Sequence, residues 1–123
     1  LQELADLWDP KKLHFGITAT EALKEAEEAF HVRLARISRN PVLVNYITDI
    51  NDHIRAVRRL GWPNKKSVTD TYEEHFCICD MLLQRDFEGA KAEMTNHIRK
   101  SQDQANRITL HQIYSNRTAL KFD

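Results

Sequence analysis

The sequence predicts an all-α antiparallel helical bundle, and three observations lead to that prediction. Apolar residues recur at three- and four-residue spacing along most of the chain. No β-branched run alternates with polar residues over the length of a strand. Only three glycines and three prolines are available to interrupt long elements. A chain of 123 residues is long enough for one domain with a single hydrophobic core.

The first two predicted helices occupy the N-terminal third of the chain. Residues 1–8 are expected to end a short helix at Pro10, and residues 11–18 to form a connector. Thr18 or Thr20 can cap the second helix, because a hydroxyl oxygen accepts from the orphan N–H groups of a first turn. The apolar stripe of this helix is Leu23, Ala26, Phe30, Leu34 and Ile37.

The third predicted helix begins at Pro41, since proline is tolerated at the first helical position. The segment Gly61-Trp62-Pro63-Asn64 is expected to close it. Its expected core face is Leu43, Ile47, Ile50, Ile54, Val57 and Leu60.

The last two predicted helices form a hairpin around Asp86. One starts near Ser67, and Asp86 caps the longer one that follows. Expected inward residues of the first are Tyr72, His75, Phe76, Cys79 and Leu82 or Leu83. Those of the second are Phe87, Ala90, Met94, His97, Ile98, Ser101, Ala105 and Ile108.

Composition excludes several classes of function. Eighteen basic and eighteen acidic residues cancel, so the chain has no basic footprint for nucleic acid. No apolar run approaches the roughly 20 residues that span a bilayer, and the N-terminal residues are not a signal peptide. Cys77 and Cys79 are poorly placed for a disulfide on one helix, and we interpret them as reduced thiols of a cytoplasmic protein.

Two histidines are placed symmetrically about the predicted turn. His75 lies 11 residues before Asp86, and His97 lies 11 residues after it. Equal arms of a helical hairpin bring two such residues to the same height, and both lie on inward stripes. We therefore expect the two imidazoles to face each other.

A carboxylate and a third imidazole share one face of an earlier helix. Glu27 and His31 are four residues apart, hence about 40° apart around the axis. With His75 and His97 they offer three nitrogens and one oxygen, a set that suits Zn, Ni, Mn or Fe(II). Glu28, three residues before His31, is an alternative to Glu27.

A structural interpretation of these histidines is the alternative to a metal site. A lone histidine on an apolar face is more often a core residue than a ligand, but three in this arrangement favour a metal. The Glu28-to-His31 spacing also suggests a di-iron bundle, which needs a second Glu-x-x-His pair. Tyr72 and Met94 stand three residues before the other two histidines, so that interpretation fails. The histidines left as surface or loop residues are His14, His53 and His111.

The third predicted helix also carries polar residues beside its core stripe. Asn51 and Arg58 fall about one and three turns on from Ile47, and either is expected to reach a cavity above the metal. A guanidinium there would pair with a carboxylate ligand. By default, the basic run that includes Arg55 and Arg59 is a solvated helix face.

These residues together resemble the FCD-type ligand-sensing domain of FadR-subfamily GntR transcriptional regulators. The resemblance covers residues 20 to 101. Its motifs are Glu27-x-x-Phe30-His31-x-x-Leu34, Asn40-Pro41-x-Leu43, Glu74-His75-x-x-Ile78-Cys79, Asp86, Ala90, Met94 and His97-Ile98.

The resemblance implies an effector-binding and dimerisation domain over residues 1–123 of a bacterial protein. Its metal ligands by position are Glu27, His31, His75 and His97, with zinc the first choice. Metal and nearby polar side chains would hold a small carboxylate effector. Occupancy would alter DNA binding by a winged helix-turn-helix domain. The resemblance implies that this domain and the first sensing-domain helix are not among residues 1–123. Glu27 departs from the aspartate usual in the family.

Three hypotheses follow from the sequence. The leading one is the sensing domain of a homodimeric, metabolite-responsive regulator and not an enzyme. The second is a metal-dependent hydrolase or lyase on a helical bundle, which requires a general base. The third is a structural bundle with three core histidines, which predicts no bound metal.

Overall fold

The described part of the chain forms an all-α bundle, as the sequence predicts. The computed structural model describes residues 1–18, 20–59 and 65–120, and only the backbone at 58, 59, 65, 108–110, 112, 113 and 115–120. Its five helices are α1 (Gln2–Leu7), α2 (Glu21–Ile37), α3 (Pro41–Arg59), α4 (Lys65–Leu83) and α5 (Phe87–Leu120).

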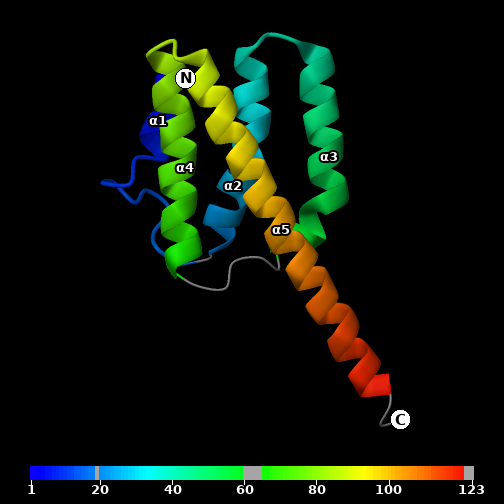
Figure 1. The fold of residues 1–123 in the computed structure, drawn as a ribbon. Coiled ribbons are helices and arrows are strands. Elements are labelled where there is room, and N and C mark those ends of the chain that lie inside the picture. Colours follow the sequence, from blue (N-terminus) through cyan, green and yellow to red (C-terminus); the bar gives the residue numbers. More distant parts are fainter. Residues whose placement is uncertain (19, 60–64, 121–123) are drawn as a thin grey trace.

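The helices pack as two antiparallel hairpins with α1 against one of them (Figure 1). The hairpin of α2 and α3 lies beside that of α4 and α5, and α1 packs on α4. Helix α5 crosses the bundle diagonally, contacts α3, and continues well beyond the other helices toward the C-terminus. Helices from three parts of the sequence therefore meet in the middle of the molecule.

Short polar side chains determine where the helices begin. Thr20, Asn40 and Asp86 each accept hydrogen bonds from backbone N–H groups two or three residues further on, at 2.9 to 3.3 Å. Beyond the C-terminal ends of α2 and α4, Arg39 and Arg85 adopt left-handed backbone angles, with φ of 59° and 61°. The predicted starts at Thr20, Asn40-Pro41 and Asp86 are thereby confirmed.

The hydrophobic core lies between α1, α2 and α4. Trp8 at the end of α1 is its largest buried side chain, 1% exposed, although the sequence identified no core role for it. The buried cluster comprises Leu4, Ala5, Trp8, Leu23, Phe30, Val68, Tyr72, Ile78 and Cys79.

The prediction of a buried core face on α3 is wrong. Leu43, Ile50 and Ile54 are 40%, 51% and 39% exposed, because α3 packs on α2 but stands away from α4. Four residues of the predicted stripe instead form one wall of a cavity: Ile47, Ile50, Ile54 and Val57. The predicted closing residues of this helix, 60–64, lie outside the described part of the chain.

Three inward positions predicted for α5, Phe87, Ile98 and Ser101, are also exposed. Phe87 is 61% exposed because it begins the helix at the end of the bundle, and Ile98 is 52% exposed because it borders the cavity. In the part of the chain that the structure describes, no helix is both long enough and apolar enough to cross a membrane.

Candidate metal centre

Four side chains from three helices converge in the middle of the bundle. Glu27 and His31 come from successive turns of α2, His75 from α4 and His97 from α5. One ligand atom of each lies within 4.8 Å of the corresponding atoms of the others. Glu27, His75 and His97 are buried and His31 is half-buried, so most of the cluster is shielded from solvent.

The hairpin of α4 and α5 brings its two histidines into contact. His75 Nε2 lies 3.3 Å from His97 Nε2, as expected for residues equally distant from Asp86. The His31 and His97 rings stack with centroids 5.3 Å apart. Since two imidazole lone pairs repel each other, a neutral pair at this distance needs one ring to donate its N–H to the other.

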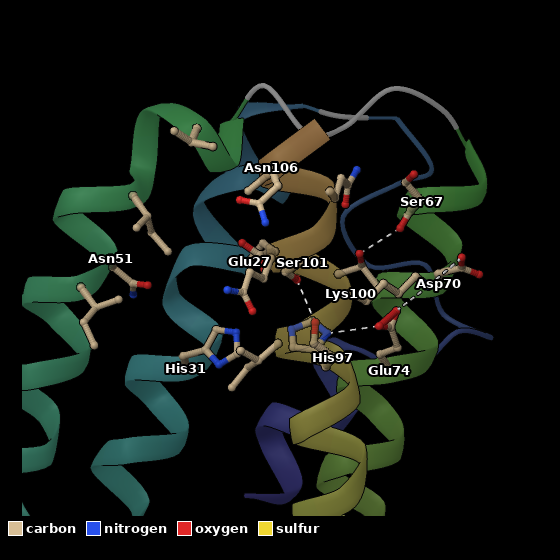
Figure 2. Close-up of a pocket in the computed structure, with 18 of the residues that line it drawn as sticks. Glu27, His31, Asn51, Ser67, Asp70, Glu74, His97, Lys100, Ser101 and Asn106 are labelled. Carbon is tan, nitrogen blue, oxygen red and sulfur yellow. Dashed lines mark hydrogen bonds and ion pairs between the residues drawn. The ribbon is translucent and has the colours of Figure 1, made fainter. Parts of the chain in front are cut away.

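A carboxylate behind His97 orients that ring, and the sequence analysis did not predict it. Glu74 Oε1 lies 3.3 Å from His97 Nδ1, so the Nδ1–H can donate to it while Nε2 faces the cluster. Lys100 Nζ in turn donates to Glu74 Oε2 at 3.3 Å and to Asp70 Oδ2 at 3.2 Å (Figure 2). Two features of the sequence could have indicated this role of Glu74. It directly precedes His75, and the cation Lys100 lies three residues after His97.

The local charges keep Glu74 ionised. Burial alone raises the pKa of Glu74, but the hydrogen bond and charge of His97, together with the charge of Lys100, outweigh burial and lower it. For Lys100, burial lowers the pKa, whereas hydrogen bonds and charges from Asp70 and Glu74 raise it above its ordinary value. Glu74 is therefore an acceptor for His97, not a donor.

A cavity of about 700 Å³ opens beside the cluster (Figure 2). Glu27, His31 and His97 line its inner end. The wall from α3 is apolar apart from Asn51, whereas the walls from α4 and α5 are mainly polar. The polar residues of these walls include Ser67, Asp70, Thr71, Glu74, Lys100, Ser101, Gln104 and Asn106.

Asn51 and Arg58 were predicted to reach this cavity, and the structure describes the side chain of Asn51. Asn51 is buried and lines the cavity, and its Nδ2 donates to the backbone carbonyl of Glu28 at 2.9 Å. The side chain of Arg58 lies outside the described residues.

The other polar candidates lie away from the cluster. Glu28 accepts from Arg55 Nε at 3.0 Å, which directs its carboxylate toward α3 and leaves Glu27 as the acid of the cluster. The histidines expected on the surface, His14, His53 and His111, are exposed. The thiols predicted to be unpaired, Cys77 and Cys79, are both free.

The donor set fits a divalent transition metal. Imidazole nitrogen is a preferred ligand of zinc, nickel and iron, and the carboxylate supplies one negative charge close to where the metal charge would lie. Four ligand atoms from a buried site that adjoins a cavity match a centre that keeps coordination positions open toward a small molecule.

Comparison with known proteins identifies the family of this chain. The model of the FCD domain family matches residues 1–100, which include α1 and all four residues of the cluster, so this chain belongs to the FCD domain family. The family match begins at residue 1, whereas the resemblance in sequence motifs begins at residue 20.

A curated relative extends the comparison to a whole protein. Over 88 residues the chain is 34% identical to the Nta operon transcriptional regulator of Aminobacter aminovorans. The alignment covers 72% of this chain and 40% of that protein, so the match spans less than half the length of this relative. No solved structure matches the chain significantly.

Proposed function

We propose that this chain is the metal-dependent sensing domain of a bacterial, cytoplasmic GntR-family transcriptional regulator. Glu27, His31, His75 and His97 hold one divalent metal, most favourably zinc, with nickel, manganese or iron as alternatives. A small carboxylate effector occupies the adjoining cavity. The supporting observation is the convergence of three imidazoles and one carboxylate, within 4.8 Å, at the inner end of that cavity.

The cavity gives the effector a defined orientation. A bound metal supplies a Lewis-acidic point that attracts a carboxylate. The apolar α3 wall accepts the hydrocarbon part of the effector, and hydroxyl and amide groups of α4 and α5 accept its polar substituents. Asn51 and Arg58 are the proposed α3 contributions to ligand binding. The bond from Asn51 to the α2 backbone would hold its amide at the cavity edge.

Effector binding would regulate DNA binding by population shift. In a homodimer, an effector that binds one arrangement of subunits more tightly favours that arrangement by the difference in binding free energy. DNA would be contacted only through a winged-helix domain outside this sequence. Similarity to a relative that is named as an operon transcriptional regulator supports this role. The net charge of zero agrees with DNA contact through another domain, because this chain has no basic footprint for nucleic acid.

The same geometry disfavours the metal-dependent hydrolase or lyase. A general base works best with a pKa near the working pH, and the base must be able to take a proton. The cavity carboxylates Asp70 and Glu74 both pair with Lys100, and the pKa of Glu74 is lowered. We therefore propose binding and not catalysis. Turnover in a panel of hydrolase and lyase assays would favour the enzyme instead.

Metal content tests the proposal. We would purify the chain without chelator and measure bound metals by elemental mass spectrometry beside the variants His75→Ala/His97→Ala and His53→Ala/His111→Ala. The second variant also removes two imidazoles, but from exposed positions. We expect about one metal per chain in the wild type and control and none in the cluster variant. Absence of metal from the folded wild type, or equal metal in all three, would overturn the proposal.

Thermal stability then tests whether a small carboxylate effector binds through the metal. With metal bound, we expect a small carboxylate to raise the melting temperature of the wild type, and the amide of the same compound to have little effect. Stabilisation by the carboxylate that is equal in metal-loaded and metal-stripped protein would contradict a metal-anchored effector.

A further inference from the structure

The ring of His75 is enclosed by aromatic side chains on the side away from the cavity. His75 is fully buried, and Phe30 of α2 stacks on it with centroids 3.8 Å apart and planes 4° apart. Trp8, the residue directly after α1, meets the same imidazole nearly perpendicularly, with centroids 4.3 Å apart and an interplanar angle of 83°. Phe30 belongs to the helix that carries Glu27 and His31, whereas Trp8 is the C-cap residue of a different helix.

Phe30 and Trp8 restrain different sides of the ring. The three centroid separations place them in directions about at right angles around His75. Phe30 therefore covers a face of the imidazole, and Trp8 lies against its edge. Stacking alone would still allow the ring to slide and turn in its own plane, and a large side chain at the edge opposes that movement.

Trp8 is itself fixed by the connector that follows α1. Its indole also packs on Phe15 and Tyr72, each with centroids 5.4 Å away. The Tyr72 hydroxyl accepts from the backbone N–H of Phe15 at 2.9 Å and donates to the carbonyl of Gly16 at 2.8 Å. The connector is thus closed onto α4, one helical turn before His75.

We propose that Trp8 is a positioning residue for His75, and that docking of α1 is thereby linked to metal binding. This inference rests on the proposed metal centre. The indole holds the imidazole so that Nε2 points toward His97, which is 3.3 Å away. Linkage is reciprocal, so if loss of Trp8 weakens metal binding, metal binding must stabilise the docked α1 by the same factor.

Three variants separate positioning from general packing. Trp8→Leu removes the ring at the edge of His75, and Trp8→Phe keeps a smaller ring there. Phe15→Leu is the matched control, because Phe15 packs on Trp8 but makes no described ring contact with His75. All three lose buried aromatic area, so a purely structural role predicts similar consequences for each. Zinc affinity would be measured by chelator competition, where circular dichroism shows the metal-free variants to be folded.

We expect zinc affinity to fall about 10- to 100-fold in Trp8→Leu, the range typical for partners that orient a metal ligand. The fall should be smaller in Trp8→Phe and within about threefold in Phe15→Leu. Equal losses in Trp8→Leu and Phe15→Leu, or no loss at Trp8, would overturn the proposal. If Trp8→Leu does not fold, Trp8→Phe against Phe15→Leu decides in the same way.

Hydrogen exchange supplies a second test that does not rely on variants of α1. In the wild type, zinc should slow amide exchange in residues 2–8. This effect should vanish in His97→Ala, which removes a proposed ligand from α5 and leaves the α1 side chains intact. If amide exchange in α1 is equally fast with and without bound zinc, the proposal is overturned, but the metal centre itself is not. A wild type that binds no zinc would instead refute the metal centre first.

Discussion

Replacing Glu74 by glutamine removes the charge behind His97 while keeping the shape of the side chain. In the wild type, the carboxylate lies 3.3 Å from His97 Nδ1, and its side chain is only 22% exposed. A glutamine oxygen can still accept the Nδ1–H, so the ring keeps its orientation. The His97 ring loses the negative charge that makes it a better electron donor toward a metal.

The expected loss of zinc affinity in Glu74→Gln follows from this geometry. Loss of a residue that orients a metal ligand typically costs 10- to 100-fold in affinity. Because the 3.3 Å separation is slightly long for a hydrogen bond and the amide retains an acceptor, we expect Glu74→Gln at the lower end. A tenfold loss of zinc affinity corresponds to about 1.4 kcal/mol. Glu74→Ala, which also loses the acceptor, should approach the upper end.

Asp70→Asn is the matched control for this experiment. Asp70 bonds the same Lys100 at 3.2 Å and has a similar exposed fraction, 28%, but makes no described hydrogen bond to a cluster histidine. By chelator competition, zinc affinity should change less than threefold in this variant. Equal losses in Glu74→Gln and Asp70→Asn would show that only the summed negative charge matters. That result would refute the orienting role of Glu74.

Four further predictions concern the stability of the bundle and its thiols. Asp86→Ala removes the cap of α5 and should lower the free energy of unfolding by about 1 kcal/mol in urea titrations; an unchanged midpoint would contradict the cap. Arg85→Gly should raise the same free energy by about 0.5–1 kcal/mol, because the left-handed angle at this position suits glycine, and destabilisation would count against that reasoning. Burial raises the pKa of Cys79 from 9.0 to about 11, so at pH 8 a thiol reagent should modify Cys77 first and Cys79 only on unfolding. Since the unfolded state ionises first, the contribution of Cys79 to stability should be retained below pH 9 and lost between pH 9 and about 11, and Cys79→Ala should flatten that loss.

The fold and the two residue pairs of the cluster were accessible from sequence because they depend on spacing along helices. The equal arms around Asp86 predicted the contact between His75 and His97, and the four-residue spacing predicted that Glu27 and His31 share a face. Helical geometry fixes such relations before any tertiary contact is known.

The remaining features depend on which helix covers which face. The apolar stripe of α3 has the same periodicity whether it faces a core or a cavity, so its exposure at Ile50 was not predictable. In the sequence, Glu74 has the pattern of a surface carboxylate. Only the register between α4 and α5 in the structure places it beside His97. Likewise, a short helix with no long amphipathic pattern gave no indication that Trp8 would reach His75.

X-ray absorption at the zinc edge of the metal-loaded chain would identify the ligands of the four-residue centre. We expect nitrogen and oxygen ligands at about 2.0–2.1 Å, with outer-shell scattering from three imidazoles that decreases in His75→Ala. Sulfur at about 2.3 Å, which would implicate Cys77 or Cys79, or a shell without imidazole scattering, would contradict the four-residue centre.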